Sequence, residues 1–515
     1  MFRNAPSWPV LALALVACGG SKDDPSDPTS SDTDTDTDTD SDTDTDSDTD
    51  TDSDTDTDTG TPGDGRVQVV DASDPHMVTI QADPPVDGDV AIACDGGGDE
   101  VLLWELPGFT APLALAGLLE DTSYACTLVD LATDERSTFS VHTVSGDAPT
   151  ASVEVHPTLT PSAPPYLLVN TNDQCGSDLV PALRLYDLDG RARWAHQQPG
   201  DVNLATEARY HGDGLIVWGG GYSPDYALQY LNLDHTVQTT LGHEQAPDAT
   251  MFHHDGKLLD DGTELILAEV PNTDGATTWL GWRAIGRGGS WTGSVDSQQL
   301  FDDGWLPTGG PDEDAYHANW VDLVDGVLYV SQCFTDEILA IDPATSDVLW
   351  RIGPRPGSLQ LVDPTGAPLP ATDLPMCQHG LEVIGDQVLV YDNGRYPDRD
   401  FSRATAITVD PGAGTATVDW MYSEPDWFEN AMGDIDHLGG GRVLVHMAHV
   451  ECWGLFPDAT TTIELDTATQ EVVWRMTFDD NYVASYRAER VDACDALPHA
   501  RYCPGVADRL TDLGL

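Results

Sequence analysis

The sequence predicts an all-β protein, a six-bladed β-propeller preceded by a small β-sandwich. The first observation is a repeated unit of four short strands, in which the third closes on Asp and the fourth often ends in Trp. The second is that six such units recur about every 56 residues, a period typical of propeller blades. The third is a run of short strands, separated by Asp-Gly pairs and prolines, ahead of the repeat.

Composition restricts the class of protein before any motif is considered. The chain has 515 residues, with 89 acidic and 22 basic side chains and a formal net charge of −67. A nucleic-acid-binding protein needs a basic face, so this charge argues against that class. Hydrophobic residues make up 40% of the chain, which is enough to bury a large core and excludes a wholly disordered protein.

The first 17 residues give the expected cellular address. Residues 1–17 contain one Arg followed by a short apolar run, which is typical of a secretory signal peptide. The run ends in Val16-Ala17-Cys18-Gly19, which resembles a bacterial lipoprotein cleavage box with Cys18 as the lipidated residue. No later apolar run approaches the roughly 20 residues of a membrane span. We therefore expect a cell-envelope protein held on the outer membrane by its lipid anchor alone, facing the periplasm or the surface.

An acidic segment, residues 18–65, follows the proposed anchor. Asp occupies every even position from Asp32 to Asp58, alternating with Thr or Ser. Such a segment has nothing to bury and its charges repel one another, so it is expected to be a disordered, extended tether.

The predicted sandwich covers residues 66–147. Its clearest strands lie at 66–70, 90–94 and 124–128, and the approach to the last of these resembles a late strand of a fibronectin type III-like domain. Cys94 and Cys126 fall on separate strands, so we expect them to bridge the two sheets, as an exported protein permits. A spacer or adhesion role without chemistry is the simplest expectation for this domain.

The repeat covers residues 150–480. The strongest units end at Trp194, Trp350, Trp420 and Trp474, and weaker copies end near Thr239 and Trp291. A solenoid is the structural alternative, but irregular loop lengths favour closure into a ring. The tail, residues 481–515, is expected to lie outside the six units and to pack against them.

In a propeller, the loop entering the first strand of a blade and the loop leaving its second strand open on one face. Several chemically suggestive residues fall at such positions here. They are His254 in the third unit; Tyr316, His317 and Asn319 in the fourth; His379, Asn393 and Arg395 in the fifth; and His446 and His449 in the sixth. His437 lies at the far end of its strand and is expected on the opposite face. The sequence therefore predicts a functional cluster at one channel mouth.

These segments, His253-His254-Asp255, Asp314-x-x-His317-x-Asn319, Gln378-His379 and Asp392-Asn393-Gly394-Arg395, resemble bacterial arylsulfate sulfotransferases in their order. Ser402-Arg403-Ala404 and Trp420-Met421-Tyr422 fit the same pattern. The resemblance implies transfer of a sulfuryl group from an aryl sulfate to a phenol through a sulfo-histidine, with no cofactor or nucleotide donor. It implies that His317, His379 and Arg395 form the oxyanion-binding and acid–base set.

The nucleophilic histidine implied by the resemblance belongs to the last blades. His449 is the first choice because it shares the channel face, His446 is the second and His437 the third. A neutral imidazole, with an ordinary pKa of about 6.5, is a good nucleophile near pH 7, and attack on sulfur gives ping-pong kinetics.

The remaining roles concern substrate binding and the leaving group. His254, Asn319, Tyr316 and Asn393 are the candidate substrate-binding residues. Arg395 offers a planar fork to sulfuryl oxygens, and His317 or His379 can give a proton to the departing phenolate. Tyr316, Trp320, Trp427 and Phe428 can flank an aryl ring, although packing is the simpler expectation for most of them.

Other functions stay open from the sequence. A non-catalytic propeller that binds a glycan or a protein is the main alternative. Clustered histidines also suit Zn²⁺ or Cu²⁺, although no tight ligand motif occurs and no metal is expected. A Ser-His-Asp hydrolase is unsupported because no Gly-x-Ser-x-Gly motif is present. The oligomeric state is not indicated.

Nine cysteines fit the exported address. With Cys18 set aside, the expected disulfide pairs are Cys94–Cys126 and Cys494–Cys503. The pairing of Cys175, Cys333, Cys377 and Cys452 cannot be deduced from the sequence.

Overall fold

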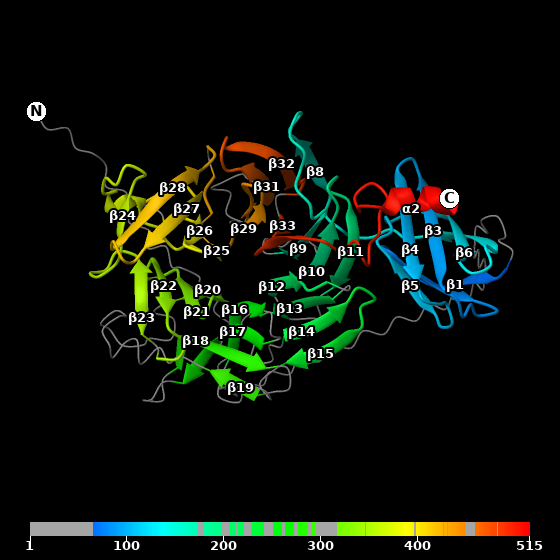
Figure 1. Cartoon of the computed structure of the whole chain (residues 1–515), viewed down its shortest axis with the longest axis horizontal. Coiled ribbons are helices and arrows are strands. Elements are labelled where there is room, and N and C mark those ends of the chain that lie inside the picture. The colour runs from blue at the N-terminus through cyan, green and yellow to red at the C-terminus, as the bar shows by residue number, and fades with distance from the viewer. Residues whose placement is uncertain are drawn as a thin grey trace, which may run out of the picture. The chain divides into compact units, whose positions relative to one another are not determined.

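The computed structural model describes most of the chain after the acidic segment (Figure 1). The described ranges are 65–173, 180–197, 205–212, 215–220, 228–241, 251–259, 263–271, 277–286, 290–293, 317–345, 347–395, 398–425, 427–429, 431–448, 459–480 and 483–515. The predicted signal peptide, Cys18 and the predicted tether lie outside them. No helix in these ranges is long and apolar enough to cross a membrane.

Residues 67–142 form a sandwich of two antiparallel sheets. One sheet contains β1 (Val67–Asp74), β2 (Met77–Ala82) and β5 (Leu113–Ala116). The other contains, in order, β4 (Glu100–Leu106), β3 (Val90–Gly97), β6 (Ser123–Asp130) and β7 (Arg136–His142). Buried and exposed residues alternate along β7, so one side of the strand faces the core between the sheets. Its likeness to a fibronectin type III domain stays a prediction.

The Cys94–Cys126 disulfide is present, but it does not join the two sheets. Its two residues face each other on β3 and β6, which are neighbouring strands of one sheet. The sequence placed the two cysteines on separate strands correctly and assigned those strands to the wrong sheets, because strand order is not visible in strand spacing.

Six sheets, antiparallel except for one outer strand, make up the described part of residues 151–491. In the first three sheets, neighbouring strands pair in this order: β11 (Ala192–Gln197), β10 (Ala182–Tyr186), β9 (Tyr166–Asp173) with β33 (Val483–Ala484) and β34 (Ala488–Val491); β12 (Ala205–Tyr210), β13 (Leu215–Gly220), β14 (Leu228–Asn232), β15 (Val237–Leu241); β16 (Met251–Leu258), β17 (Thr263–Pro271), β18 (Thr277–Gly286), β19 (Ser290–Gly293).

The other three sheets follow the same plan, with one extra outer strand in each of the last two. They are β20 (Ala318–Val324), β21 (Val327–Gln332), β22 (Glu337–Ile341), β23 (Val348–Ile352); β25 (Leu381–Ile384), β26 (Gln387–Asp392), β27 (Arg403–Asp410), β28 (Thr415–Tyr422), β24 (Gln360–Val362); β29 (Asp434–Gly439), β30 (Arg442–Met447), β31 (Thr461–Asp466), β32 (Glu471–Phe478), β8 (Ala151–Val155). Short helices are η1 (Ala371–Asp373) and α2 (Val506–Leu513).

These sheets follow one another around a centre (Figure 1). First strands of neighbouring sheets contact each other, as β12 does with β16 and β16 with β20. The buried Trp474 of the last sheet donates its indole N–H to the carbonyl of Leu188 in the first sheet, at 2.9 Å. Contact between the last and first sheets is what a propeller requires and an open solenoid lacks. The predicted all-β, propeller-like architecture is confirmed.

The expectation for the tail was wrong in its first part. β33 and β34 pair with β9 and so supply the innermost strand of the first sheet. Residues 483–491 therefore belong to the ring, and the segment after them lies outside the sheets. That segment carries the Cys494–Cys503 disulfide, which confirms the predicted pair.

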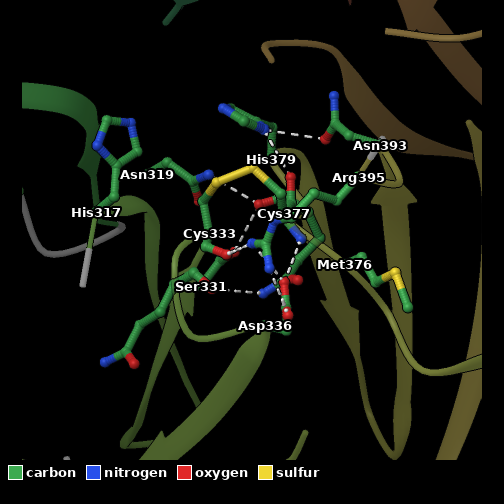
Figure 2. Close-up of a disulfide and its surroundings, with 12 residues drawn as sticks. His317, Asn319, Ser331, Cys333, Asp336, Met376, Cys377, His379, Asn393 and Arg395 are labelled. Carbon is green, nitrogen blue, oxygen red and sulfur yellow. Dashed lines mark hydrogen bonds and ion pairs between the residues drawn. A yellow bond between two sulfur atoms is a disulfide. The ribbon is translucent and has the colours of Figure 1, made fainter. Parts of the chain in front are cut away.

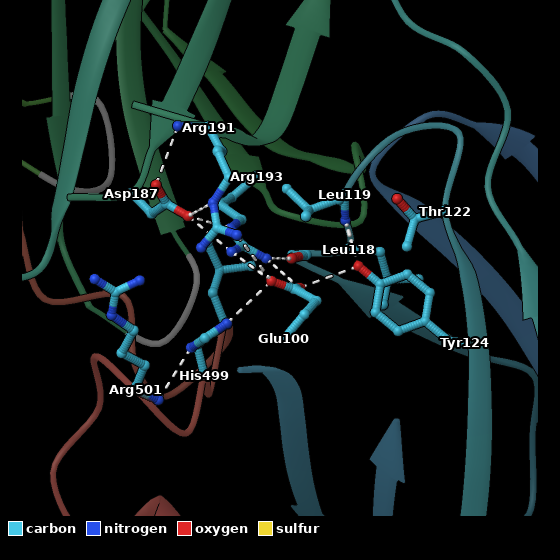
Figure 3. A network of polar contacts seen from close by, with 12 residues as sticks. Glu100, Leu118, Leu119, Thr122, Tyr124, Asp187, Arg191, Arg193, His499 and Arg501 are labelled. Carbon is cyan, nitrogen blue, oxygen red and sulfur yellow. Dashed lines mark hydrogen bonds and ion pairs between the residues drawn. The ribbon is translucent and has the colours of Figure 1, made fainter. Parts of the chain in front are cut away.

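A buried network of charged side chains joins the sandwich, the first sheet and the tail (Figure 3). Glu100 of β4 accepts two hydrogen bonds from Arg193 of β11, at 2.5 and 2.8 Å. Arg193 also contacts Asp187 at 2.7 Å, and Nε2 of His499 lies 3.2 Å from Glu100. The sandwich is therefore attached to the propeller through paired charges that are almost fully buried.

Candidate active site

Residues from three consecutive sheets meet near the start of their first strands, and Figure 2 shows those of the fourth and fifth sheets. His254 lies within β16, His317 directly precedes β20, and His379 lies two residues before β25. Arg395 follows β26. Because β26 runs antiparallel to β25, its C-terminal end lies on the same face of the propeller as the start of β25. The structure therefore brings together the four residues that topology placed on one channel mouth.

His254 and His317 form a close pair. Their Nε2 atoms are 3.2 Å apart and their rings meet edge to face, with centroids 4.6 Å apart. Both residues have left-handed backbone conformations, with φ of 56° and 46°. Such conformations are uncommon for residues other than glycine and tend to occur at functional sites. At this distance one Nε2 donates and the other accepts, so the pair can hold a proton between two sheets.

His379 is buried and held by its Nδ1 atom. Nδ1 lies 3.0 Å from both the carbonyl oxygen of Cys377 and Oδ1 of Asn393. Both partners are acceptors, because the Asn393 amide nitrogen donates to the Met432 carbonyl, so Nδ1 carries the proton. Burial, and then the neighbouring His317, lower the pKa of His379 to about 3. The imidazole is therefore neutral, with its lone pair on Nε2.

Arg395 is fixed by an acidic partner that the sequence did not reveal. Its Nη1 donates to Oδ2 of Asp336 at 2.9 Å, and its Nη2 lies 2.8 Å from Oδ1 of Asp336. Nη2 also donates to the carbonyl of Cys333 at 2.8 Å. The side chain is 39% exposed, so the guanidinium can still meet a ligand from solvent. A guanidinium of fixed direction that still reaches solvent suits an anionic ligand.

Gly394 allows Arg395 to take this position. Gly394 has φ of +82°, and a Cβ at this position would lie 2.6 Å from the carbonyl oxygen of Phe401. Ser402 donates to the carbonyl of Asn393 at 2.7 Å, and Arg403 contacts Asp392 at 2.8 Å. The Asp-Asn-Gly-Arg and Ser-Arg segments are thus two sides of one tightly packed loop.

A disulfide between Cys333 and Cys377 lies at the centre of these residues (Figure 2). It joins the loop after β21 to the segment before β25. The sequence left this pairing open. Cys175 and Cys452 lie outside the described residues.

Asn319 lies beneath the mouth. It is fully buried, and its side-chain nitrogen donates to the carbonyl of Gln378 at 2.8 Å. Its backbone carbonyl accepts from Arg487, which also contacts Asp255 at 2.8 Å. Asn319 therefore supports the segment that carries His379, and its direct contact with substrate stays a prediction, as does that of Asn393.

The late histidines are placed unequally. His449 and Tyr316 lie outside the described residues, as does the side chain of His253. His446 is buried on β30 with Nδ1 2.8 Å from Oγ1 of Thr462, and burial lowers its pKa to about 4. His437 is exposed, three residues beyond the Asp434 end of β29. The identity of the nucleophile stays a prediction.

Two of the four aromatic candidates have the packing role expected for most of them, and two further aromatic side chains lie near the mouth. Trp320 is fully buried and Trp427 nearly so, which makes both packing residues. Phe334, next to Cys333, is 39% exposed and stacks on His317 with ring centroids 4.5 Å apart. Tyr486 lies between His254 and His379, 6.3 Å from each ring. No sequence motif pointed to these two residues. The one sequence feature that could have pointed to Phe334 is its position beside a cysteine in a loop between two strands.

Within the described residues, no group of three or more His, Cys, Asp or Glu side chains is arranged to hold a metal ion.

Fold and site together define a β-propeller with paired histidines and an anchored arginine at one mouth. The family model described as Arylsulfotransferase (ASST) matches residues 166–487, more than half of the chain. The chain belongs to the arylsulfotransferase family. This membership supports a transferase that acts on small-molecule aryl sulfates and phenols.

No curated protein matches the chain significantly. Among solved structures, TolB from Acinetobacter baumannii is 8% identical, with 71% of this chain and 79% of that chain covered and a TM-score of 0.39. AztD from Citrobacter koseri is 11% identical, with coverage of 78% and 97% and a TM-score of 0.27.

Proposed function

We propose that this chain transfers a sulfuryl group from an aryl sulfate to a phenolic acceptor through a sulfo-histidine intermediate. The observation that carries the proposal is the convergence of the His254–His317 pair, neutral His379 and anchored Arg395 at one mouth. The family match supports the reaction class, and the arrangement of these residues supports the assignment of roles.

In the first half-reaction, an imidazole nitrogen forms a bond to sulfur while the bond from sulfur to the aryl oxygen breaks. The electron pair leaves on the phenolate, which takes a proton from the His254–His317 pair. In the second half-reaction, the acceptor oxygen bonds to sulfur, the nitrogen–sulfur bond breaks, and the acceptor proton returns to the pair. We propose His449 as the nucleophile, with His446 second.

Arg395 and His379 divide the remaining tasks. Arg395 donates to the sulfuryl oxygens, where charge develops during transfer. His379 has its N–H committed to two carbonyl oxygens, so its free Nε2 accepts a hydrogen bond and does not donate a proton. This favours contact with the acceptor hydroxyl over the protonation of the leaving phenolate that the sequence also allowed.

Phe334 supplies a surface for the aryl ring. One face stacks on His317 and the side chain is exposed, so an aromatic substrate can pack on it beside the proposed proton donor. This position would hold the leaving oxygen close to the histidine pair.

We also propose that Cys18 is lipidated and that the protein is anchored in the bacterial cell envelope. Support comes from the sequence of residues 1–19 alone.

The test is release of phenol from a chromogenic aryl sulfate by purified protein, with and without a phenolic acceptor. His449→Ala, His379→Ala and Arg395→Ala are compared with His142→Ala, an exposed histidine on β7 of the sandwich. Acceptor-dependent release that the first three variants lose and the control keeps would support sulfuryl transfer. No release across a panel of aryl sulfates would favour a glycan- or protein-binding propeller.

A further inference from the structure

Three segments near the mouth, the β21–β22 loop, the segment before β25 and the loop after β26, are fastened together by three links. The Cys333–Cys377 disulfide joins the β21–β22 loop to the segment before β25. The Cys377 amide donates to Oδ1 of Asp336 at 2.9 Å, which adds a second link between the same segments. The third link is the ion pair between Asp336 and Arg395. Both cysteines are buried.

The backbone of the bridged cysteines contacts three of the proposed active-site residues. The Cys333 amide donates to the His317 carbonyl at 3.1 Å, and the Cys333 carbonyl accepts from Arg395. The Cys377 carbonyl accepts from Nδ1 of His379. The bridge therefore determines the relative positions of groups that come from two different sheets.

Asp336 is the side chain that connects the bridge to the guanidinium. Its two oxygens contact both terminal nitrogens of Arg395, which fixes the plane of the fork as well as its location. Because Oδ1 is also held by the Cys377 amide, the carboxylate cannot turn without breaking a backbone contact.

We propose that Asp336 is a positioning residue for Arg395 and that the Cys333–Cys377 disulfide holds Asp336 and His379 in one geometry for sulfuryl transfer. This inference rests on the proposed function. Displacement of a group by about 1 Å at a reacting centre can reduce a rate about 100-fold, so loss of either contact should slow turnover in a folded protein.

The first experiment measures kcat and KM of the full chain carrying Asp336→Asn, Arg395→Lys or both. Asp325→Asn, an exposed acid in the β20–β21 turn of the same sheet, is the control with the same change of charge. We expect Asp336→Asn to lower kcat/KM about 10- to 100-fold, chiefly through kcat, and the double variant to be no worse than Arg395→Lys alone. Multiplying effects, or wild-type kinetics in Asp336→Asn, would overturn the proposal.

The second experiment compares Cys333→Ser/Cys377→Ser with Cys94→Ser/Cys126→Ser, which removes a buried disulfide in the sandwich. Only the first pair is expected to lose activity at a temperature where thermal melts show both proteins folded. Equal activity in the two would contradict the role of the bridge. If the first pair does not fold, the kinetics of Asp336→Asn decide.

A readout that does not need turnover separates this inference from the function it rests on. Amide hydrogen exchange is measured for residues 331–337 and 376–395 in wild type and Asp336→Asn. Faster exchange in both segments of Asp336→Asn than in wild type supports the link. If wild type releases no phenol, the proposed reaction is contradicted but the link between the segments is not. Unchanged exchange contradicts the link whatever the activity.

Discussion

Nδ1 of His379 lies 3.0 Å from Oδ1 of Asn393, and this contact fixes which nitrogen of the ring carries the proton. His379 precedes the first strand of the fifth sheet and Asn393 follows its second strand. The pair therefore depends on the antiparallel return of β26 to the mouth. It leaves Nε2 unprotonated in a buried ring.

Asn393→Asp is expected to change the pH dependence of turnover. The wild-type pKa of about 3 keeps His379 neutral at every pH at which the protein would be assayed. A carboxylate in place of the amide favours the imidazolium and raises the pKa. The acid-side fall in activity should therefore begin at a higher pH in Asn393→Asp than in wild type, where protonation of the nucleophilic histidine sets it. Asn232→Asp, on β14 of another sheet, is the control, and equal profiles would contradict the assignment.

Phe334→Ala is expected to weaken binding of aryl sulfates more than it slows their chemistry. An aromatic contact contributes about 0.5–1.5 kcal/mol beyond burial, which corresponds to a rise in KM of about 2- to 12-fold. Phe401 is similarly exposed, at 40% against 39%, and Phe401→Ala serves as the control. The measurement is KM for substrates with one and two aromatic rings. A fall in kcat with unchanged KM would contradict a platform role.

Much of the ring could be predicted because each sheet carries its own local signal. A Trp within an outer strand, as at Trp194 and Trp474, marks a unit and also closes the contact with the next one. The inner strand of the first sheet has no such signal. β33 and β34 are short, and their partner β9 lies more than 300 residues earlier, so only the folded ring reveals the pairing.

The same distinction applies to the site. His254, His317, His379 and Arg395 could be predicted because each holds a fixed place relative to a strand, and strand direction sorts the faces. Asp336 and the Cys333–Cys377 bridge could not, because their contacts join loops 41 to 59 residues apart that share no repeat position. The local sequence pattern identifies the candidate site residues. The contacts between loops, which fix the positions of these residues, are visible only in the structure.

Asp436→Asn is expected to stabilise the protein at neutral pH. Burial, and then the neighbouring Asp434, raise the pKa of Asp436 well above its usual value, so the folded state keeps this group protonated. The unfolded chain releases the proton above about pH 4, so stability falls as pH rises from there toward the folded-state pKa. An amide removes that dependence.

Unfolding in urea at pH 5 and pH 7 tests this. We expect Asp436→Asn to gain about 1 kcal/mol or more at pH 7 and less at pH 5, since an uncompensated buried polar group costs about 1–3 kcal/mol. The exposed Asp400→Asn should change neither value. A loss of stability in Asp436→Asn at both pH values would show that the carboxylate is ionised and paired in the folded state.

Glu100→Gln is expected to destabilise the junction between sandwich and propeller. Burial alone would raise the pKa of Glu100, but hydrogen bonds and charge from His499 and Arg193 hold it far below its usual value. The carboxylate therefore stabilises the fold above about pH 4.5, and that stabilisation is lost as pH falls below it. Loss of the charge removes one of the two carboxylates that pair with buried Arg193, which keeps Asp187. The cost is therefore expected to lie below the roughly 3–5 kcal/mol of an unpaired buried charge.

The measurement is the free energy of unfolding at pH 7 and pH 4, with limited proteolysis to locate the opened region. Glu100→Gln should have a lower free energy of unfolding than wild type at pH 7, and that free energy should change less between pH 7 and pH 4. Proteolysis should cut it first between residues 142 and 151. A second variant, Glu100→Met/Arg193→Met, removes both charges and should recover much of the loss, because apolar pairs of similar volume can replace buried ion pairs. If both variants match wild type, the sandwich is held by its apolar contacts and the ion pair contributes nothing measurable. A loss confined to Glu100→Gln would show that the junction needs matched charges rather than this particular pair.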